Sequence, residues 1–189
     1  VEQEVLQTIP HNYVNGVCTM CGKRDESYAT EGLVFTLSDD GTYYSVTDYT
    51  GSAKEVSIPS VHQGLPVTSI GDWTFYRCSS LTSVTIPDSV TSIGDSAFYR
   101  CDSLTSIYIT DIAAWCAIDF SSNTATPFSW AQNLYLNGEL VTDLVIPDGV
   151  TSIGNWAFYD CDRLTSVTIG HRVTSIGRSA VEGCTSLKS

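Results

Sequence analysis

The residue pair best suited to metal chemistry is Cys18 and Cys21, which form a C-x-x-C-G motif with Gly22. The turn in such a motif aims two thiolates at one point, and tetrahedral zinc is commonly held by Cys and His ligands. His11 supplies a possible third ligand, but the sequence contains no second C-x-x-C. Three alternatives therefore stay open for residues 1–29: a zinc-knuckle-like site of His11, Cys18 and Cys21, a Cys18–Cys21 disulfide, or a disordered segment without metal.

The other five cysteines follow a different pattern. Cys116 lies in an apolar stretch, and four more recur at one position of a repeat described below: Cys78, Cys101, Cys161 and Cys184. Stacked strands lie about 4.8 Å apart, which permits a disulfide only when the Cβ directions are suitable. We therefore expect free, buried thiols that act as small hydrophobic side chains.

The sequence offers no recognisable catalytic constellation. His11, His62 and His171 have no Ser or Cys partner in a known motif, and G-x-S-x-G, P-loop and H-E-x-x-H patterns are absent. The acidic residues fall at turn positions such as Asp72 and Asp95, where solvated turn acids and caps are the simplest interpretation. We predict that the chain is not an enzyme and that it has no cofactor apart from the possible structural zinc.

Composition excludes two classes of partner. The 189 residues include 9 Lys plus Arg and 21 Asp plus Glu, so the formal net charge is −12. This balance argues against nucleic-acid binding, which depends on neutralising phosphates, and against a polybasic membrane contact. No apolar run reaches the roughly 18 residues that a transmembrane helix needs, so we predict no membrane insertion within this chain.

The elements that must position these residues repeat along the chain. Similar units begin near residues 53, 81, 104, 141, 164 and 187, so the basic period is 23 residues, with longer first and third units. A unit of this length cannot fold alone, and its apolar side must be buried by stacking into a solenoid. The unit from Leu81 predicts a strand ended by Pro87 and a corner at Gly94. Asp95 then predicts an N-cap for a helical turn or two, which includes 96–99 and ends near Cys101. The expected core positions in this unit are Leu81, Val84, Ile86, Val90, Ile93, Ala97, Phe98 and Cys101.

The signature LxxVxIPxxVxxIGxxAFxxC, which recurs over residues 53–189, resembles the BspA-like class of leucine-rich repeats. The resemblance implies a right-handed leucine-rich-repeat solenoid, in which each rung of about 23 residues adds a short parallel β-strand and a helical or 3-10 turn. It also implies a parallel sheet on the concave side. The family is known mainly from surface or secreted proteins of bacteria and some protists, so an extracellular or cell-surface location is expected.

Two segments depart from the repeat. Residues 30–52 alternate apolar and polar side chains around the turn signal Asp40-Gly41, which predicts a β-hairpin that caps the N-terminal end of the solenoid 53–189. The insertion at about 111–138 is rich in aromatic residues. We expect it to form a local core beside the solenoid, with a protruding recognition loop as the alternative.

The side chains between the core positions of each strand are mostly hydroxyl groups with little charge. They form either a soluble surface without a ligand or a hydrogen-bonding platform for a host or bacterial surface protein or glycan. The partner-binding candidates are Thr82, Thr85, Thr105, Tyr108, Thr165, Thr168 and, in the insertion, Trp130. The predicted function is a noncatalytic module for adhesion or recognition. The alternative is a structural spacer or accessory segment of a larger surface protein or enzyme.

Overall fold

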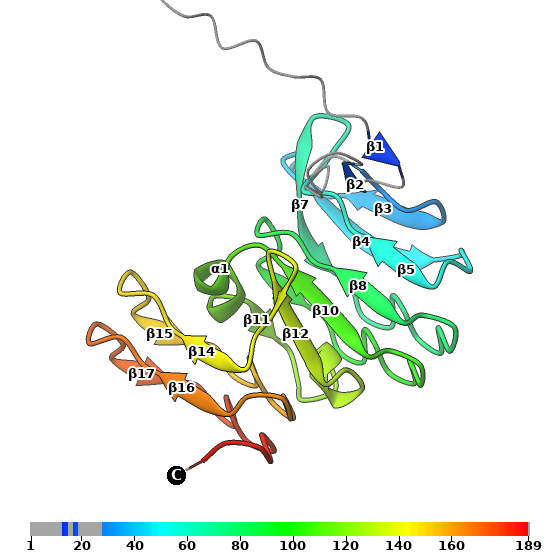
Figure 1. Cartoon of the computed structure of the whole chain (residues 1–189). Helices are drawn as coiled ribbons and strands as arrows, with labels where there is room; N and C mark the ends of the chain where they lie inside the picture. The colour runs from blue at the N-terminus through cyan, green and yellow to red at the C-terminus, as the bar shows by residue number, and fades with distance from the viewer. Residues whose placement is uncertain (1–12, 15–16, 19–27, 189) are drawn as a thin grey trace, which may run out of the picture.

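The chain folds into a stack of rungs whose short strands form two parallel ladders (Figure 1). The structure is a computed structural model that describes residues 13–14, 17–18 and 28–188. The first ladder, ladder A, consists of β5 (Glu55–Ser57), β8 (Ser83–Thr85), β10 (Ser106–Ile109) and β12 (Asn133–Leu136). Its C-terminal edge pairs with the short antiparallel strand β13 (Glu139–Leu140). The register aligns the same repeat position in every rung, with Val56 beside Val84 and Val84 beside Ile107.

The second ladder, ladder B, begins at the predicted hairpin. It consists of β4 (Tyr44–Tyr49), β7 (Leu65–Ile70), β9 (Ser92–Ile93) and β11 (Asp119–Phe120). Strand β3 (Leu33–Leu37) pairs antiparallel with β4, and β6 (Val61–His62) pairs antiparallel with β7. Since β4 also pairs in parallel with β7, the hairpin serves as the first rung of ladder B. A separate antiparallel pair is formed by β1 (Tyr13–Val14) and β2 (Val17–Cys18).

The corner segments of the rungs are successions of turns, and the predicted helical turn over 96–99 was wrong. The reason is a set of hydrogen bonds between rungs: the N–H groups of Trp73, Phe75 and Arg77 donate to carbonyls of the next rung at 2.7–3.1 Å. These bonds take the groups that a helix would use internally. Asp95 is therefore not an N-cap, and its own N–H is bonded by the Asp72 carboxylate at 2.7 Å.

The repeated apolar positions form one continuous core, as the period predicts. Phe75, Phe98 and Phe158 are fully buried, and the rings of Phe75 and Phe98 stack with centroids 5.1 Å apart. The thiols of Cys101 and Cys184, two of the four cysteines at the same repeat position, each donate to the carbonyl of the phenylalanine one rung earlier at 3.1 Å. The cysteines found free in the described part of the chain are Cys78, which is half-buried, and the buried Cys101, Cys116, Cys161 and Cys184.

The insertion packs into this core and does not protrude. It contains the only α-helix of the described residues, α1 (Ile112–Cys116), and the 3-10 helix η1 (Pro127–Ser129). Trp115, Phe120 and Phe128 are buried and in contact, with Trp115 lying 5.5 Å and 5.7 Å from the other two ring centroids.

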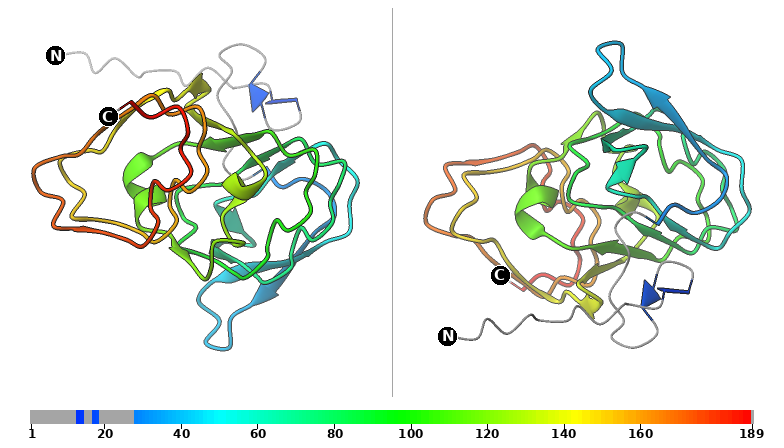
Figure 2. Two further views of the ribbon diagram at one scale, coloured as in Figure 1. Left: turned by 90° about the horizontal axis from the view of Figure 1, so that it is seen from below. Right: turned by 90° about the horizontal axis from the view of Figure 1, so that it is seen from above.

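After the insertion, the equivalent strands form two further parallel pairs, which are not hydrogen-bonded to ladder A or ladder B. Strands β14 (Asp143–Val145) and β16 (Ser166–Thr168) form one parallel pair, and β15 (Ser152–Ile153) and β17 (Ser175–Ile176) form the other. Seen along the stack, these rungs lie to one side of the N-terminal rungs, with α1 between the two groups (Figure 2). We call residues 28–140 the N-terminal block and residues 141–188 the C-terminal block.

Helix α1 joins the two blocks by taking the place of a rung. In regular rungs the phenylalanine N–H bonds to an alanine carbonyl of the next rung, as Phe75 does to Ala97. At the junction the indole Nε1–H of Trp115 donates to the Ala157 carbonyl instead, at 2.7 Å. The helix carbonyl of Cys116 likewise accepts from the N–H of Gly154 at 2.8 Å.

Candidate functional site

The outward face of ladder A carries two columns of side chains that point away from the core. This is the surface that the sequence predicts as the concave side. Alternation along each strand places Val84 and Ile107 inward and their neighbours outward. The first column is Glu55, Ser83, Ser106 and Asn133, and the second is Ser57, Thr85, Tyr108 and Tyr135.

Two tyrosines stack near the C-terminal end of the second column. The register places Tyr108 directly beside Tyr135, and their ring centroids lie 4.7 Å apart with an interplanar angle of 16°. Both side chains are half-buried, so their rings are partly accessible on the outward face. Phenol groups combine a large apolar area with a hydrogen-bonding hydroxyl, which suits them to recognition surfaces.

Tyr135 is a candidate contact residue that the sequence analysis did not list. It falls inside the insertion, 27 residues after Tyr108, so the 23-residue period does not align the two. A usable signal was present, because the triplet Leu-Tyr-Leu around Tyr135 matches Ile-Tyr-Ile around Tyr108.

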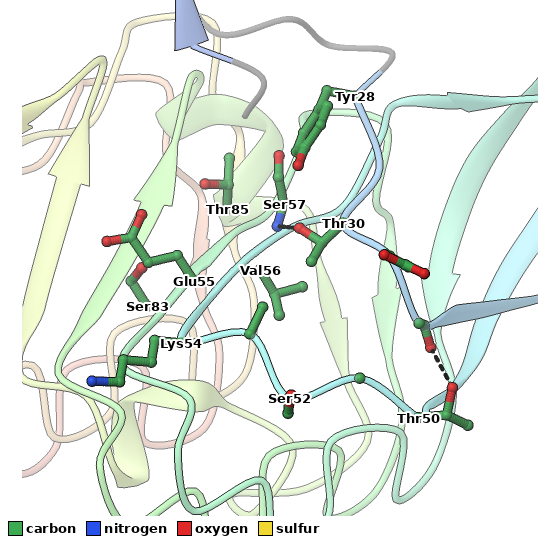
Figure 3. Close-up of a pocket in the computed structure, with 14 residues that line it drawn as sticks. Tyr28, Thr30, Thr50, Ser52, Lys54, Glu55, Val56, Ser57, Ser83 and Thr85 are labelled. Atoms are coloured by element: carbon green, nitrogen blue, oxygen red, sulfur yellow. Dashed lines mark hydrogen bonds between the residues drawn. The ribbon is translucent and has the colours of Figure 1, made fainter. Parts of the chain in front are cut away.

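A groove of about 960 Å³ lies at the other end of this face, beside the edge strand β5 (Figure 3). Tyr28, Thr30 and the outward side chains of β5 and β8 line it, so its wall is largely polar. Thr30 covers part of the β5 edge, because its hydroxyl accepts from the Ser57 N–H at 2.8 Å and its own N–H donates to the Ser57 carbonyl.

The prediction that Thr85 is an exposed contact residue was wrong. Its side chain is buried, with 9% of its area exposed, as is that of Ser57 beside it in the column. Thr85 lies between Ser57 and Tyr108 and lines the groove together with Tyr28 and Thr30. A change at Thr85 therefore alters packing as well as the surface.

The threonines that begin the rungs bond to the preceding rung. The hydroxyls of Thr82, Thr105 and Thr165 each donate to a carbonyl one rung earlier, at 2.9, 3.2 and 3.1 Å. The amide of Asn133 does the same towards Thr105, at 3.0 Å. These hydroxyl hydrogens are used inside the solenoid, so the three threonines contribute less to a free surface than the sequence suggests.

The face of the C-terminal block differs in character. Thr168 is exposed there, as predicted, and so is Val145 in the same column. The Asp143 carboxylate accepts from the hydroxyls of Ser166 and Thr165, and the bond from Ser166 in particular lowers the pKa of Asp143 below its ordinary value. This acid is therefore a stable anion at neutral pH.

Trp130, the candidate in the insertion, lies in an aromatic cluster. Its ring meets that of Tyr99 edge to face at 5.8 Å, and Tyr99 stacks on Tyr76 at 6.1 Å. Trp130 is half-buried, and within the described part of the chain its buried Nε1–H has no hydrogen-bond partner. Trp73 extends the cluster to solvent, with 50% of its side chain exposed.

The predicted zinc ligands fall mainly outside the described residues. His11 and Cys21 are not described, and Cys18 is described only as part of strand β2. Among the described residues there is no group of three His, Cys, Asp or Glu side chains that could hold a metal ion.

The buried thiols are not poised for nucleophilic chemistry. Burial, aided by the nearby Cys78, raises the pKa of Cys101 to about 12, and burial raises the pKa of Cys116 to about 12 as well. A thiolate is the reactive form, so both groups are inert at neutral pH.

Within the described ranges, no helix has both the length and the apolar character needed to cross a membrane.

A family of known repeat proteins agrees with this architecture. The model of the BspA type leucine rich repeat region matches residues 47–125 and 129–189 in six copies. A comparison with curated proteins gives no significant match. One similar solved structure is a leucine rich repeat protein of T. pallidum, with 26% identity, 84% of this chain and 89% of that chain covered, and a TM-score of 0.48. Another is a leucine rich cell surface protein of Faecalibacterium prausnitzii, with 28% identity, 86% of this chain and 53% of that chain covered, and a TM-score of 0.47. Because the family model covers most of its length, this chain belongs to the BspA-type leucine-rich repeat family.

Proposed function

We propose that the chain is a noncatalytic recognition module of a bacterial cell-surface or secreted protein, and that it binds a protein or glycan through the outward face of ladder A. The observation that carries the proposal is the stacked pair Tyr108 and Tyr135, which lies in the second column beside the uncharged Ser106 and Asn133 of the first. The surface location follows from the family and not from the geometry.

The chemistry of the face favours binding over catalysis. Ser83, Ser106 and Asn133 offer hydrogen-bonding groups beside the two phenol rings, along strands that a rigid core holds in register. Tyrosine, serine and asparagine occur together in the recognition surfaces of antibodies, where the aromatic rings supply rigid contact area and the polar groups supply adaptable hydrogen bonds. The buried thiols with raised pKa values supply no activated nucleophile.

Arrays of glycans and of purified host and bacterial surface proteins would test this proposal. We expect a ligand that binds wild-type protein and that loses at least tenfold in affinity when Tyr108 and Tyr135 are both changed to Ala. Tyr43→Ala is the matched control, since Tyr43 is an exposed tyrosine near the turn of the N-terminal hairpin. Wild-type protein that binds nothing on the arrays would favour the spacer alternative. A ligand held equally by the double variant would move the site elsewhere.

A further inference from the structure

The junction between the two blocks leaves one edge of β14, the first strand of the C-terminal block, without a neighbouring strand among the described residues. Strand β8 is paired on both edges, by β5 and β10, whereas β14 is paired only with β16. The preceding strand β12 cannot pair with β14, because β13 takes its free edge. Between these two edges lies what we call the junction groove.

The hydrogen-bonding groups of β14 divide between the two edges. The Thr142 carbonyl and the Ile146 N–H bond to β16. In a parallel ladder alternate residues face opposite neighbours, so the N–H and C=O groups of Asp143 and Val145 face the junction groove. Within the described part of the chain no hydrogen bond to these four groups is formed across the groove. Unpaired strand edges of this kind are templates for another strand.

The junction groove has room and apolar walls. Its volume is about 360 Å³, and Ile112, Leu136 and residues 139–145 line it. Leu140 and Val145, on its two sides, expose 43% and 61% of their side chains. Large exposed aliphatic side chains next to an unpaired edge are a combination that a soluble chain normally covers.

The charged side chains that line the groove are all acidic. Glu139 and Asp143 line it, both are exposed, and no Lys or Arg is among the lining residues. The Asp143 carboxylate accepts from the Ser166 hydroxyl of β16 at 2.6 Å and lies near the positive charge of Lys188, so Glu139 supplies most of the unbalanced negative charge of the groove. A cationic side chain on an incoming strand would therefore be favoured.

We propose that the junction groove binds an extended peptide segment of a partner protein, which adds a strand to the free edge of β14 and carries Lys or Arg beside aliphatic residues. A single extended chain fits the recessed edge, whereas a second copy would have to bring a whole rung between the blocks. The proposal goes beyond the proposed function, because it places a second contact at a site apart from the outward face of ladder A. Its variants leave Tyr108 and Tyr135 unchanged, so the two proposals fail separately.

The chain itself supplies the sequence of a probe. The hexapeptide LTSVTI occurs at residues 81–86 and again at 164–169, where it contains β16 and already pairs with β14 on the other edge. A labelled peptide KLTSVTIK should bind the full chain in fluorescence anisotropy. The same peptide with proline in place of valine should bind at least tenfold more weakly, because it has lost a donor and cannot form a regular strand.

Protein variants distinguish the contribution of the β14 strand edge to peptide binding from that of the acidic side chains. Val145→Pro removes an N–H that faces the groove but none that bonds to β16, so it should reduce peptide affinity at least tenfold and leave the fold intact. Glu139→Lys should weaken binding severalfold. Glu182→Lys makes the same change of charge at an exposed site on the last rung, outside the lining of the groove, and should leave binding unchanged.

Amide exchange provides a readout that needs no variant. Peptide binding should slow exchange of the Val145 N–H, which has no hydrogen-bond partner among the described residues of the free chain. Equal binding of both peptides, equal binding by Val145→Pro, or unchanged exchange at Val145 would each overturn the proposal. A dimer that forms without peptide and is lost in Val145→Pro would assign the groove to a second copy and overturn it as well.

Discussion

At the scale of single residues, hydroxyl side chains act more inside the solenoid than on its surface. A threonine at the start of a strand donates to the carbonyl one rung earlier, and this happens in both ladders, as Thr105 and Thr91 show. Each such bond satisfies a second lone pair of a carbonyl that already accepts a backbone N–H. The high Ser and Thr content is thus partly a requirement of stacking, and only the remaining outward groups are available to the proposed binding face.

The buried thiol of Cys101 should make stability fall at alkaline pH. Burial raises the pKa of Cys101 to about 12 from 9.0, so the folded thiol stays protonated where the unfolded thiol ionises. Because the folded pKa is the higher one, this contribution is complete below pH 9 and is lost as pH rises towards 12. Urea unfolding at pH 7.5 and 10 should show a loss that is smaller in Cys101→Ala, by up to about 1.4 kcal/mol per pH unit. Equal losses in the two proteins would contradict the prediction.

The N-terminal cysteines should bind zinc without supporting the solenoid. If His11, Cys18 and Cys21 hold a zinc-knuckle-like site, a metal assay should find about one zinc per chain. Cys18→Ser should abolish it, while the thermal unfolding of the protein stays unchanged, because Cys18 is not among the described residues that form the core or pack against it. A metal-free protein whose mass shows a Cys18–Cys21 disulfide would support the alternative instead.

At the scale of elements, the repeat determines strands well and corners poorly. The alternation around Val84 and the prolines after β5 and β8 were enough to predict strands of ladder A, because those signals lie within one rung. The corner over 96–99 has local helix signals, but bonds to neighbouring rungs override them and Ser96 adopts a positive φ of 52°. Those bonds depend on stacking, which a single unit does not reveal.

The insertion shows the same limit more strongly. Its aromatic residues predict a core, but nothing in the sequence shows that helix α1 replaces a rung between Phe120 and Ile153. That arrangement depends on Trp115 reaching the Ala157 carbonyl, 42 residues away. The alignment of Tyr135 with Tyr108 was hidden for the same reason, since the rung that contains α1 is longer than the period.

The Trp115 indole should be the main polar link between the blocks. Trp115→Phe keeps an aromatic ring in the core but removes the donor to Ala157, which leaves a buried carbonyl without that partner. We expect a loss of about 1–3 kcal/mol in the free energy of unfolding. Limited proteolysis should then cut the C-terminal block first. Trp73→Phe, at an exposed site, is the matched control and should change stability by less than about 0.5 kcal/mol. Equal losses in the two variants would show that the link is unimportant.

At the scale of the whole molecule, the two blocks differ in how far they can stand alone. The N-terminal block has a hairpin cap, four strands in each ladder and the aromatic core of the insertion. The C-terminal block has two strands in each ladder, and its last rung exposes Ile169 and Ile176. Stability in a solenoid is approximately a sum of rungs and their interfaces, so the smaller block should depend on the larger one.

Equivalent core truncations in the two blocks should therefore accelerate amide exchange over different lengths of the chain. Phe98 and Phe158 occupy the same repeat position and are both fully buried, so changing either to Ala should cost about 3–5 kcal/mol locally. In hydrogen exchange, Phe158→Ala should speed exchange over residues 141–188 and leave residues 28–110 unchanged. Phe98→Ala should speed exchange in both blocks, because the C-terminal rungs lose the surface on which they stack. Uniform acceleration along the chain in Phe158→Ala would show instead that the solenoid opens as one cooperative unit across α1.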